Sequence, residues 1–209
     1  MNWMFAAILI CGASVVVTSC GDDDDDKGTQ QPTTGNTYEV TLSVIVPQCS
    51  ADLFTVNVDY TGPDGKSNTV TVKDGDKSEA LPADVQKYLD KQKENIIKGY
   101  KINSDSTAFL ENLIVKNIVL TIPTGKSFSY SGTLKARTDY KTPSGETFHY
   151  LAPFIYPSYK IISGNAPSST VLSENFTLRV SLSVETEHVA EFIDIWNNTN
   201  IGKGSLTMD

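Results

Sequence analysis

Most of the sequence from Thr37 onward alternates between apolar and polar residues, and this two-residue period constrains the fold more than any other feature. Successive side chains of a β-strand point to opposite faces, so an alternating segment predicts a strand with one buried face. The first such segment ends at Pro47 and carries apolar residues at Tyr38, Val40, Leu42, Val44 and Val46. Further segments of this kind lie at 54–60, 68–73, 110–122, 128–140, 148–156 and 176–184. The chain is therefore predicted to be mainly β.

Short turns join the predicted strands, which favours antiparallel pairing. Gly62-Pro63-Asp64-Gly65 and Asp74-Gly75-Asp76-Lys77 are turn sequences, and we expect the first three strands to form a meander. About seven or eight strands with one or two short helices are typical of an antiparallel β-sandwich, with an Ig-like or transthyretin-like topology as the finer prediction. The predicted sandwich covers 37–209, and the sequence leaves open whether it is one large domain or two small ones.

Aromatic residues mark two neighbouring predicted strands. Even-numbered positions carry most of their apolar residues: Phe128, Tyr130, Leu134, Ala136 and Tyr140 in the first strand, and Phe148, Tyr150, Ala152, Phe154 and Tyr156 in the second. With a turn at 142–146, we predict a hairpin in which Tyr140 lies opposite Phe148 and Leu134 lies opposite Phe154. This register puts all the aromatic residues on one face.

Two other segments have the helical period. Residues 82–98 are rich in Lys, Gln, Glu and Leu and stop before Gly99, which predicts a surface helix. A second helix is predicted from four apolar residues that have the i, i+3, i+4, i+7 spacing: Val189, Phe192, Ile193 and Trp196. Residues 202–209 are expected to form a short tail.

The N-terminus carries an export signature. The apolar run from Phe5 to Val17 has the length found in signal peptides and is shorter than a transmembrane anchor. It ends in Val17-Thr18-Ser19-Cys20, which resembles the lipobox of bacterial lipoproteins. The resemblance implies that residues 1–19 are a lipoprotein signal peptide. It also implies that Cys20 carries fatty chains, such as palmitate, that hold the mature protein to a membrane.

An acidic cluster follows the lipobox at Asp22, Asp23, Asp24, Asp25 and Asp26. A cluster at this place resembles that of Bacteroidetes-type surface lipoproteins, and it implies an outer-membrane protein that faces the cell surface. Because the like charges repel one another, residues 20–36 are predicted to be a flexible tether. Fully stretched, this tether reaches at most about 55 Å.

Charge and cysteine content restrict the partners and the chemistry. The formal net charge is −8 and the sequence has no basic stripe, so we expect no nucleic-acid partner. Cys11 lies in the signal and Cys20 is the lipidation site, which leaves Cys49 without a disulfide partner. We expect Cys49 to be a small buried residue, because its sequence neighbours include neither a histidine nor a cation.

The sequence offers few residues for catalysis. His149 and His188 are its only histidines, and the common nucleophile, phosphate-binding and zinc motifs are missing. The oxygen-rich loop at 74–79 departs from the EF-hand pattern and is interpreted as a solvated turn. We therefore predict a non-enzymatic protein with no metal site and no cofactor.

Two sets of residues are candidates for a surface role. Most of the aromatic residues are expected in the core, but a platform for stacking on sugar rings is the alternative for Tyr150, Tyr156, Tyr159 and Trp196. Pro153 and Pro157 favour an edge strand, since proline cannot donate a hydrogen bond to a neighbouring strand. Asp105-Ser106-Thr107 resembles the O-glycosylation site of exported Bacteroidetes proteins, which implies a glycan on Ser106.

These features lead to one functional hypothesis and several alternatives. We expect a cell-envelope lipoprotein whose β domain binds an extracellular glycan or a protein partner. A structural or adhesion subunit similar to the Bacteroidetes fimbrillins is one alternative, and an envelope enzyme or inhibitor is another. Coplanar exposed aromatic residues would favour glycan capture, a detachable terminal strand would favour the subunit, and a polar cleft would favour the enzyme. A large dry cavity would instead favour a carrier of small apolar ligands.

Overall fold

The computed structural model describes residues 35–100, 112–165 and 180–207. Its elements in chain order are β1 (Thr37–Pro47), α1 (Gln48–Ala51), β2 (Phe54–Thr61), β3 (Ser67–Val72), α2 (Ala83–Tyr100), β4 (Leu113–Pro123), β5 (Ser127–Ala136), β6 (Thr147–Leu151), β7 (Phe154–Ser163), β8 (Val180–Glu185), the 3-10 turn η2 (Thr186–His188), α3 (Val189–Trp196) and β9 (Asn200–Thr207). The predicted lipidation site, the aspartate cluster and the predicted glycosylation site lie outside the described residues.

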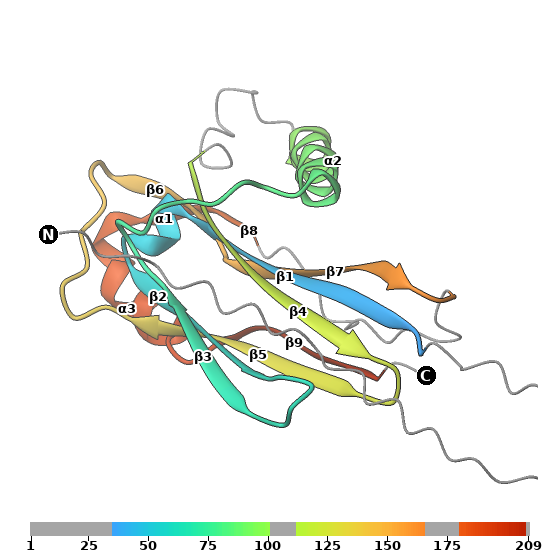
Figure 1. Ribbon diagram of the computed structural model, residues 1–209. Helices are drawn as coiled ribbons and strands as arrows, with labels where there is room; N and C mark the ends of the chain where they lie inside the picture. Colours follow the sequence, from blue (N-terminus) through green and yellow to red (C-terminus); the bar gives the residue numbers. More distant parts are fainter. Residues whose placement is uncertain (1–34, 101–111, 166–179, 208–209) are drawn as a thin grey trace, which may run out of the picture. The chain divides into compact units, whose positions relative to one another are not determined.

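Two antiparallel sheets form the layers of the molecule (Figure 1). Within the described residues, sheet A has the strand order β4-β1-β7 and sheet B has the order β3-β2-β5-β9. A two-stranded sheet of β6 and β8 adjoins them at one end (Figure 1). The predicted antiparallel β-sandwich is confirmed. The described residues belong to one compact unit, so the chain has one sandwich in this region. The Ig-like or transthyretin-like topology stays a prediction.

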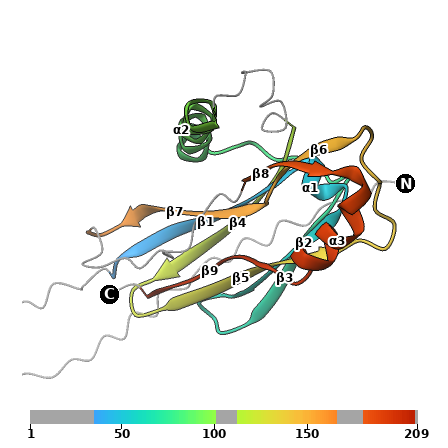
Figure 2. The ribbon, with the colours of Figure 1, turned by 180° about the vertical axis from the view of Figure 1, so that it is seen from behind.

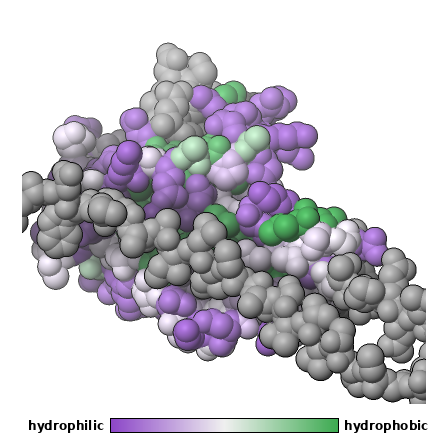
Figure 3. All heavy atoms as spheres, viewed as in Figure 1, coloured by the Kyte–Doolittle hydropathy of each residue, from purple (hydrophilic) through white to green (hydrophobic). Residues whose placement is uncertain are grey.

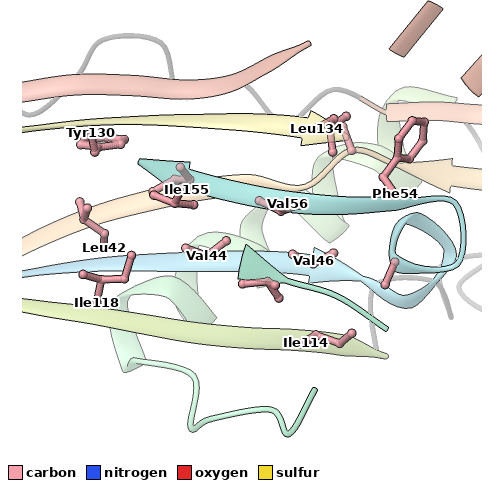
Figure 4. Close-up of a cluster of buried hydrophobic side chains, with 14 of the residues drawn as sticks. Leu42, Val44, Val46, Phe54, Val56, Ile114, Ile118, Tyr130, Leu134 and Ile155 are labelled. Atoms are coloured by element: carbon pink, nitrogen blue, oxygen red, sulfur yellow. The ribbon is translucent and has the colours of Figure 1, made fainter. Parts of the chain in front are cut away.

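The core lies between sheets A and B. All five even-numbered residues of β1 are fully buried, as the alternation predicts. Figure 4 shows Leu42, Val44 and Val46 of β1 beside residues of β4 and facing residues of sheet B, among them Val56 and Leu134. Removing this apolar surface from water is the main favourable contribution to folding.

Helix α2 covers part of the outer face of sheet A (Figure 2). Its residues Val85 and Leu89 form a second apolar cluster with Ile45 of β1 and Phe154 of β7. Consequently β1 is buried at every position from 42 to 47, whereas its first half is buried only at alternate positions. The predicted surface helix is confirmed. Among the described residues, no helix has both the length and the apolar character needed to cross a membrane.

The predicted meander of the first three strands is wrong. Strands β2 and β3 do form a hairpin, but β1 lies in sheet A, where it pairs with β4 and β7. Helix α1 begins directly after Pro47 and connects a strand of sheet A to a strand of sheet B. The apolar faces of β1 and β2 therefore meet across the core, and their edges do not pair.

The predicted aromatic hairpin is also wrong. Strand β5 pairs with β2 and β9 in sheet B, β6 pairs with β8, and β7 pairs with β1 in sheet A. Leu134 consequently lies opposite Val56, and Phe154 lies opposite Ile45. Pro157 lies in β7, an edge strand of sheet A within the described residues, in agreement with the sequence analysis.

In place of a hairpin turn, the chain after β5 makes two backbone hydrogen bonds to another connection. The connection that follows β5 is tied to the turn between α1 and β2. Arg137 N donates to Leu53 O at 3.0 Å, and Lys141 N donates to Asp52 O at 3.2 Å. These bonds hold the connection at the end of the sandwich, where the chain leaves sheet B. Most of these aromatic residues are buried nonetheless, but they do not share one face: Phe128, Tyr130, Phe148 and Tyr150 lie in the core between the sheets, whereas Phe154 and Tyr156 pack with α2 on the outer side of sheet A.

The C-terminal residues form a strand and not the predicted tail. Strand β9 pairs with β5, with Gly202 opposite Gly132, and completes sheet B. Helix α3 precedes it and buries Val189, Phe192 and Ile193, which confirms the second predicted helix.

Gly132 of β5 lies against the side chains of Ile155 and Ile201, so a substitution there tests the packing of the core. A Cβ atom at this position would lie 2.5 Å from Ile155 Cδ1 and 2.9 Å from Ile201 Cγ1. We predict that Gly132→Ala lowers the free energy of unfolding, measured by urea denaturation, by about 1–3 kcal/mol, because a buried side chain has little room to move. The Ile155→Val background removes the Cδ1 atom and should reduce this loss. An equal loss in both backgrounds would contradict the steric explanation.

Candidate functional site

The four aromatic residues considered as a ligand platform do not share one exposed face. Tyr150 is fully buried, and its ring centroid lies 5.2 Å from that of Trp196 at the end of α3. Tyr156 lies elsewhere, on the outer side of sheet A, with its ring centroid 5.5 Å from that of Tyr88 of α2. Tyr159 packs edge-on against Tyr38 and is 38% exposed. The structure therefore brings together the buried Tyr150 and the half-buried Trp196, and separates them from the other two.

Cys49 and the histidines do not form a nucleophilic site. Cys49 is half-buried in α1, and the pKa of its thiol is raised, mainly by burial. A raised pKa keeps the thiol protonated at neutral pH, which is the less nucleophilic form. His149 is exposed on β6, and His188 lies in η2 at the start of α3.

His188 lies among three glutamates, Glu185, Glu187 and Glu191. Its Nε2 atom is 3.3 Å from a carboxylate oxygen of Glu185 and 3.5 Å from one of Glu187. Glu185, Glu187 and His188 each offer a ligand atom within 4.8 Å of the others, but all three are exposed. Exposed groups of this kind commonly occur without a bound ion, and we assign no metal to this one.

Asp74 is the centre of the most connected polar cluster in the described residues. Its carboxylate accepts hydrogen bonds from Lys141 Nζ at 2.8 Å and from Gln48 Nε2 at 2.8 Å, and Arg137 lies 3.5 Å away. Arg137 also donates to the carbonyl oxygen of Ala51 at 2.9 Å. The hydrogen bond from Lys141, followed by that from Gln48, lowers the pKa of Asp74 to about 2. The cluster joins α1, the loop after β3 and the connection after β5.

A short segment before α2 covers part of the free edge of β4. Ser78 Oγ accepts a hydrogen bond from Val115 N at 3.0 Å and donates to Leu113 O at 3.1 Å. Glu79 N donates to Val115 O at 2.9 Å, and Asn117 N donates to a Glu79 carboxylate oxygen at 2.8 Å. Since an uncovered edge strand is a template for unwanted pairing, this segment protects the edge. The side-chain oxygens of the loop at 74–79 accept or donate hydrogen bonds within the protein, although the loop residues stay exposed or half-buried.

The comparisons with known proteins gave no relatives. No family model, no curated protein and no solved structure matches this chain.

The outer face of sheet B is uniformly polar. Its outward residues carry a hydroxyl or amide side chain at every described position except Asp59, Lys135 and Lys203: Thr55, Asn57 and Thr61 of β2, Ser67, Thr69 and Thr71 of β3, Ser127, Ser129, Ser131 and Thr133 of β5, and Asn200 and Ser205 of β9. All of these residues are exposed or half-buried. In Figures 1 and 2, α2 lies over the opposite sheet and α3 lies at one end of the sandwich.

Side-chain hydrogen bonds connect neighbouring strands on this face. Thr69 Oγ1 donates to Asp59 at 2.5 Å, and Thr71 Oγ1 donates to Asn57 Oδ1 at 2.9 Å. On the same face, between β9 and β5, Asn200 Nδ2 donates to Ser131 Oγ at 2.8 Å. These bonds restrict the rotamers of the side chains, so part of the face is ordered before any partner binds.

Sequence analysis missed this face, although part of its signal is visible. Ser127, Ser129, Ser131 and Thr133 occupy every second position of one segment. The pattern shows that one strand has a hydroxyl-bearing face. It does not show which other strands lie beside it.

A different surface lies on β7, where apolar side chains reach the solvent. Tyr159, Ile161 and Ile162 are 38%, 43% and 51% exposed. Figure 3 shows an apolar patch over this end of β7. Exposed apolar patches of this kind occur at protein contacts.

The cluster around Asp74 predicts how stability depends on pH. The pKa of Asp74 is about 2 in the folded protein, below the ordinary value of 3.8 for an aspartate. Because the pKa of Asp74 is lower in the folded protein than in the unfolded chain, ionised Asp74 stabilises the folded state at pH values above its pKa in the unfolded chain. This stabilisation is lost as the pH falls to the pKa of Asp74 in the folded protein. We predict that Asp74→Asn costs about 1–2 kcal/mol of unfolding free energy at pH 7, and progressively less below about pH 4.

Denaturant unfolding at several pH values would measure this effect. Asp194→Asn is the matched control, because Asp194 is exposed on α3 and the substitution should change stability little at any pH. A loss for Asp74→Asn that stays constant from pH 7 to pH 3 would contradict the assignment.

Proposed function

We propose that this protein is a non-enzymatic cell-envelope lipoprotein, held to the outer membrane by lipid on Cys20, whose β-sandwich binds an extracellular glycan or a protein partner. The sequence Val17-Thr18-Ser19-Cys20 and the following aspartates support the anchor and the surface location. The fold supports the binding role, because the core is closed between two sheets and the sandwich presents a broad outer face.

The observation that carries the binding role is the difference between the outer faces of the two sheets. Part of the outer face of sheet A is packed against α2 through Ile45 and Phe154. The outer face of sheet B has only hydrophilic side chains, which remain exposed or half-buried. This face can therefore contact a partner while the core stays intact, and no conformational change is needed.

The tether determines how the domain meets its partner. In this proposal, residues 20–36 connect the lipid to β1, whose first residue is Thr37. A charged, polar linker of this length lets the domain turn and reach tens of ångströms from the membrane. Several weak contacts formed by neighbouring copies then add up on a multivalent partner.

The proposed location predicts the outcome of proteinase treatment of intact cells. We expect the wild-type domain to be degraded. A variant with Asp22–Asp26 replaced by alanine should be protected, because the export signal is lost, and Cys20→Ala should no longer fractionate with the membrane. Protection of the wild-type domain on intact cells, with degradation after lysis, would contradict surface display.

A second candidate function is an assembling structural subunit, and strand β9 favours it. Within the described residues, β9 is an edge strand that pairs only with β5, and exchange of a terminal strand between copies requires a strand in such a position. Ser129 lies opposite Ser205 in this pair.

A double variant, Ser129→Cys with Ser205→Cys, tests strand exchange. An intramolecular disulfide would lock β9 to β5 of the same copy. If exchange builds an assembly, the oxidised variant should stay monomeric in size-exclusion chromatography, and reduction should restore assembly. A wild-type chain that is monomeric at all concentrations would contradict this second function.

A further inference from the structure

Strand β7 lies at an edge of sheet A. It pairs with β1, and beyond β1 no strand in the described part of the chain pairs with it. The edge of a ten-residue strand presents a row of backbone N–H and C=O groups that can bond a further strand. Pro157 has no N–H and contributes only its carbonyl oxygen. This edge is therefore a template for the addition of a β-strand.

The core face of β7 is only partly covered. Val40 and Tyr38 of β1 are 0% exposed, whereas their partners on β7, Tyr159 and Ile161, are 38% and 43% exposed. Tyr159 nevertheless points toward the core, because its ring packs edge-on against that of Tyr38. The core of the sandwich is thus closed at β1 and still open to solvent at the next strand. An added strand with apolar residues on its core side would cover it.

The pairing of β8 shows which part of the chain leads to this edge. Only Ala152 and Pro153 separate β6 from β7, and β8 pairs antiparallel with β6, with Val180 opposite Leu151. In an antiparallel pair, residues that precede Val180 continue past Leu151 toward β7. The connection 166–179 lies outside the described residues, and its C-terminal end therefore leads to the start of β7.

The other end of the same connection is fixed at the far end of β7. Asn165 N donates to Asn36 Oδ1 at 2.9 Å, and Tyr38 OH donates to Asn165 O at 3.1 Å. The connection thus has to return along β7, a distance of about 30 Å for a strand of this length. The fourteen residues 166–179 would reach about 21 Å as an α-helix and about 48 Å when extended. The return therefore requires a largely extended chain.

We propose that residues 170–179 continue β8 along the edge of β7, so that sheet A has the strand order β4-β1-β7-β8. Continuing the register of β6 and β8 places Phe176 opposite Ile155 and Leu172 opposite Tyr159. Both apolar residues then fall on the core face, beside the exposed sides of Tyr159 and Ile161. A slip of one residue would turn them to the outer face, so this register is the favoured one.

The sequence of the segment fits this place. Phe176 and Leu178 begin the alternating run 176–184, of which β8 is the described part. Glu174 has the same parity, and an inward-pointing charge is typical of an edge strand, where it discourages pairing with further chains. The inference concerns the sandwich itself and holds with or without the lipid anchor and the binding role proposed above.

Cysteine pairs test the register in the full chain, with its three native cysteines replaced by serine. Ser158 is half-buried on the outer side of β7, and Ser173 faces it in the proposed pairing. Ser158→Cys with Ser173→Cys is therefore the test pair. Ser158→Cys with Ser168→Cys is the matched control: its cysteines are closer in sequence but about 17 Å apart in the proposed pairing. Random contact alone would favour the control.

We expect the test pair to form an intramolecular disulfide at least tenfold faster than the control under oxidation with copper phenanthroline. The disulfide is detected as a reducible mobility change of the monomer on denaturing gels. A rate equal to or below that of the control, or no disulfide at all, would overturn the proposal. Disulfide-linked dimers in place of the monomer would also overturn it, and would assign the edge to the segment of a second copy.

Two adjacent apolar residues of the segment provide an independent measurement. Leu172→Asp puts a charge on the core face and should raise the equilibrium constant of unfolding, measured by urea denaturation, at least tenfold. Val171→Asp is the matched control, because the same change on the outer face should alter this constant less than about twofold. Equal effects of the two substitutions, or no effect of Leu172→Asp, would overturn the packing of the segment against β7.

Discussion

The second half of strand β1 is packed between two apolar layers. Its even-numbered residues face sheet B, and Ile45 on the other side faces Val85 and Leu89 of helix α2. On folding, a strand buried on both faces removes more apolar surface from water than a strand with one solvated face. It also lies at the centre of sheet A, hydrogen-bonded to β4 and β7. Sheet A, the position of α2 and the inner wall of the core all depend on these contacts.

This packing makes the two sides of the sandwich unequal. Sheet A is partly covered by α2, and Ser78 and Glu79 protect part of its β4 edge with side-chain and backbone hydrogen bonds. Sheet B contributes to the core with one face and leaves the other face to its serine, threonine and asparagine side chains. The surface that we assign to ligand binding is therefore separate from the contacts that hold the fold together. Changes to that surface can alter binding at little cost in stability.

The ends of the sandwich are held by polar contacts. Asp74 connects Gln48 and Lys141, and Arg137 bonds the carbonyl oxygen of Ala51. These contacts tie together three connections that have few apolar residues of their own. They fix the place where the chain passes between the sheets, and a rigid sandwich presents its outer face with little loss of entropy on binding.

The sequence by itself determined most of the strands, the two longer helices and the buried face of most strands, because these depend on the period of the apolar residues. Tyr38, Leu134 and Tyr150 are buried as the alternation predicts, and α2 and α3 lie where the helical spacing predicts them. The pairing of the strands was decided only by the tertiary structure. Any two strands can form the same backbone hydrogen bonds. The alternation of apolar residues therefore predicts which face of a strand is buried but does not predict which strand pairs with it.

The candidate surface follows the same division. The hydroxyl residues of β5 are visible as an alternating run in the sequence. Their meeting with residues of β2, β3 and β9 required the connection through α1, the polar contacts around Asp74 and the pairing of β9 with β5. Tyr150 and Tyr156 are both even-numbered, yet Tyr150 packs in the core and Tyr156 packs on the outer side of sheet A, because the strand is interrupted between β6 and β7 and the two strands belong to different sheets.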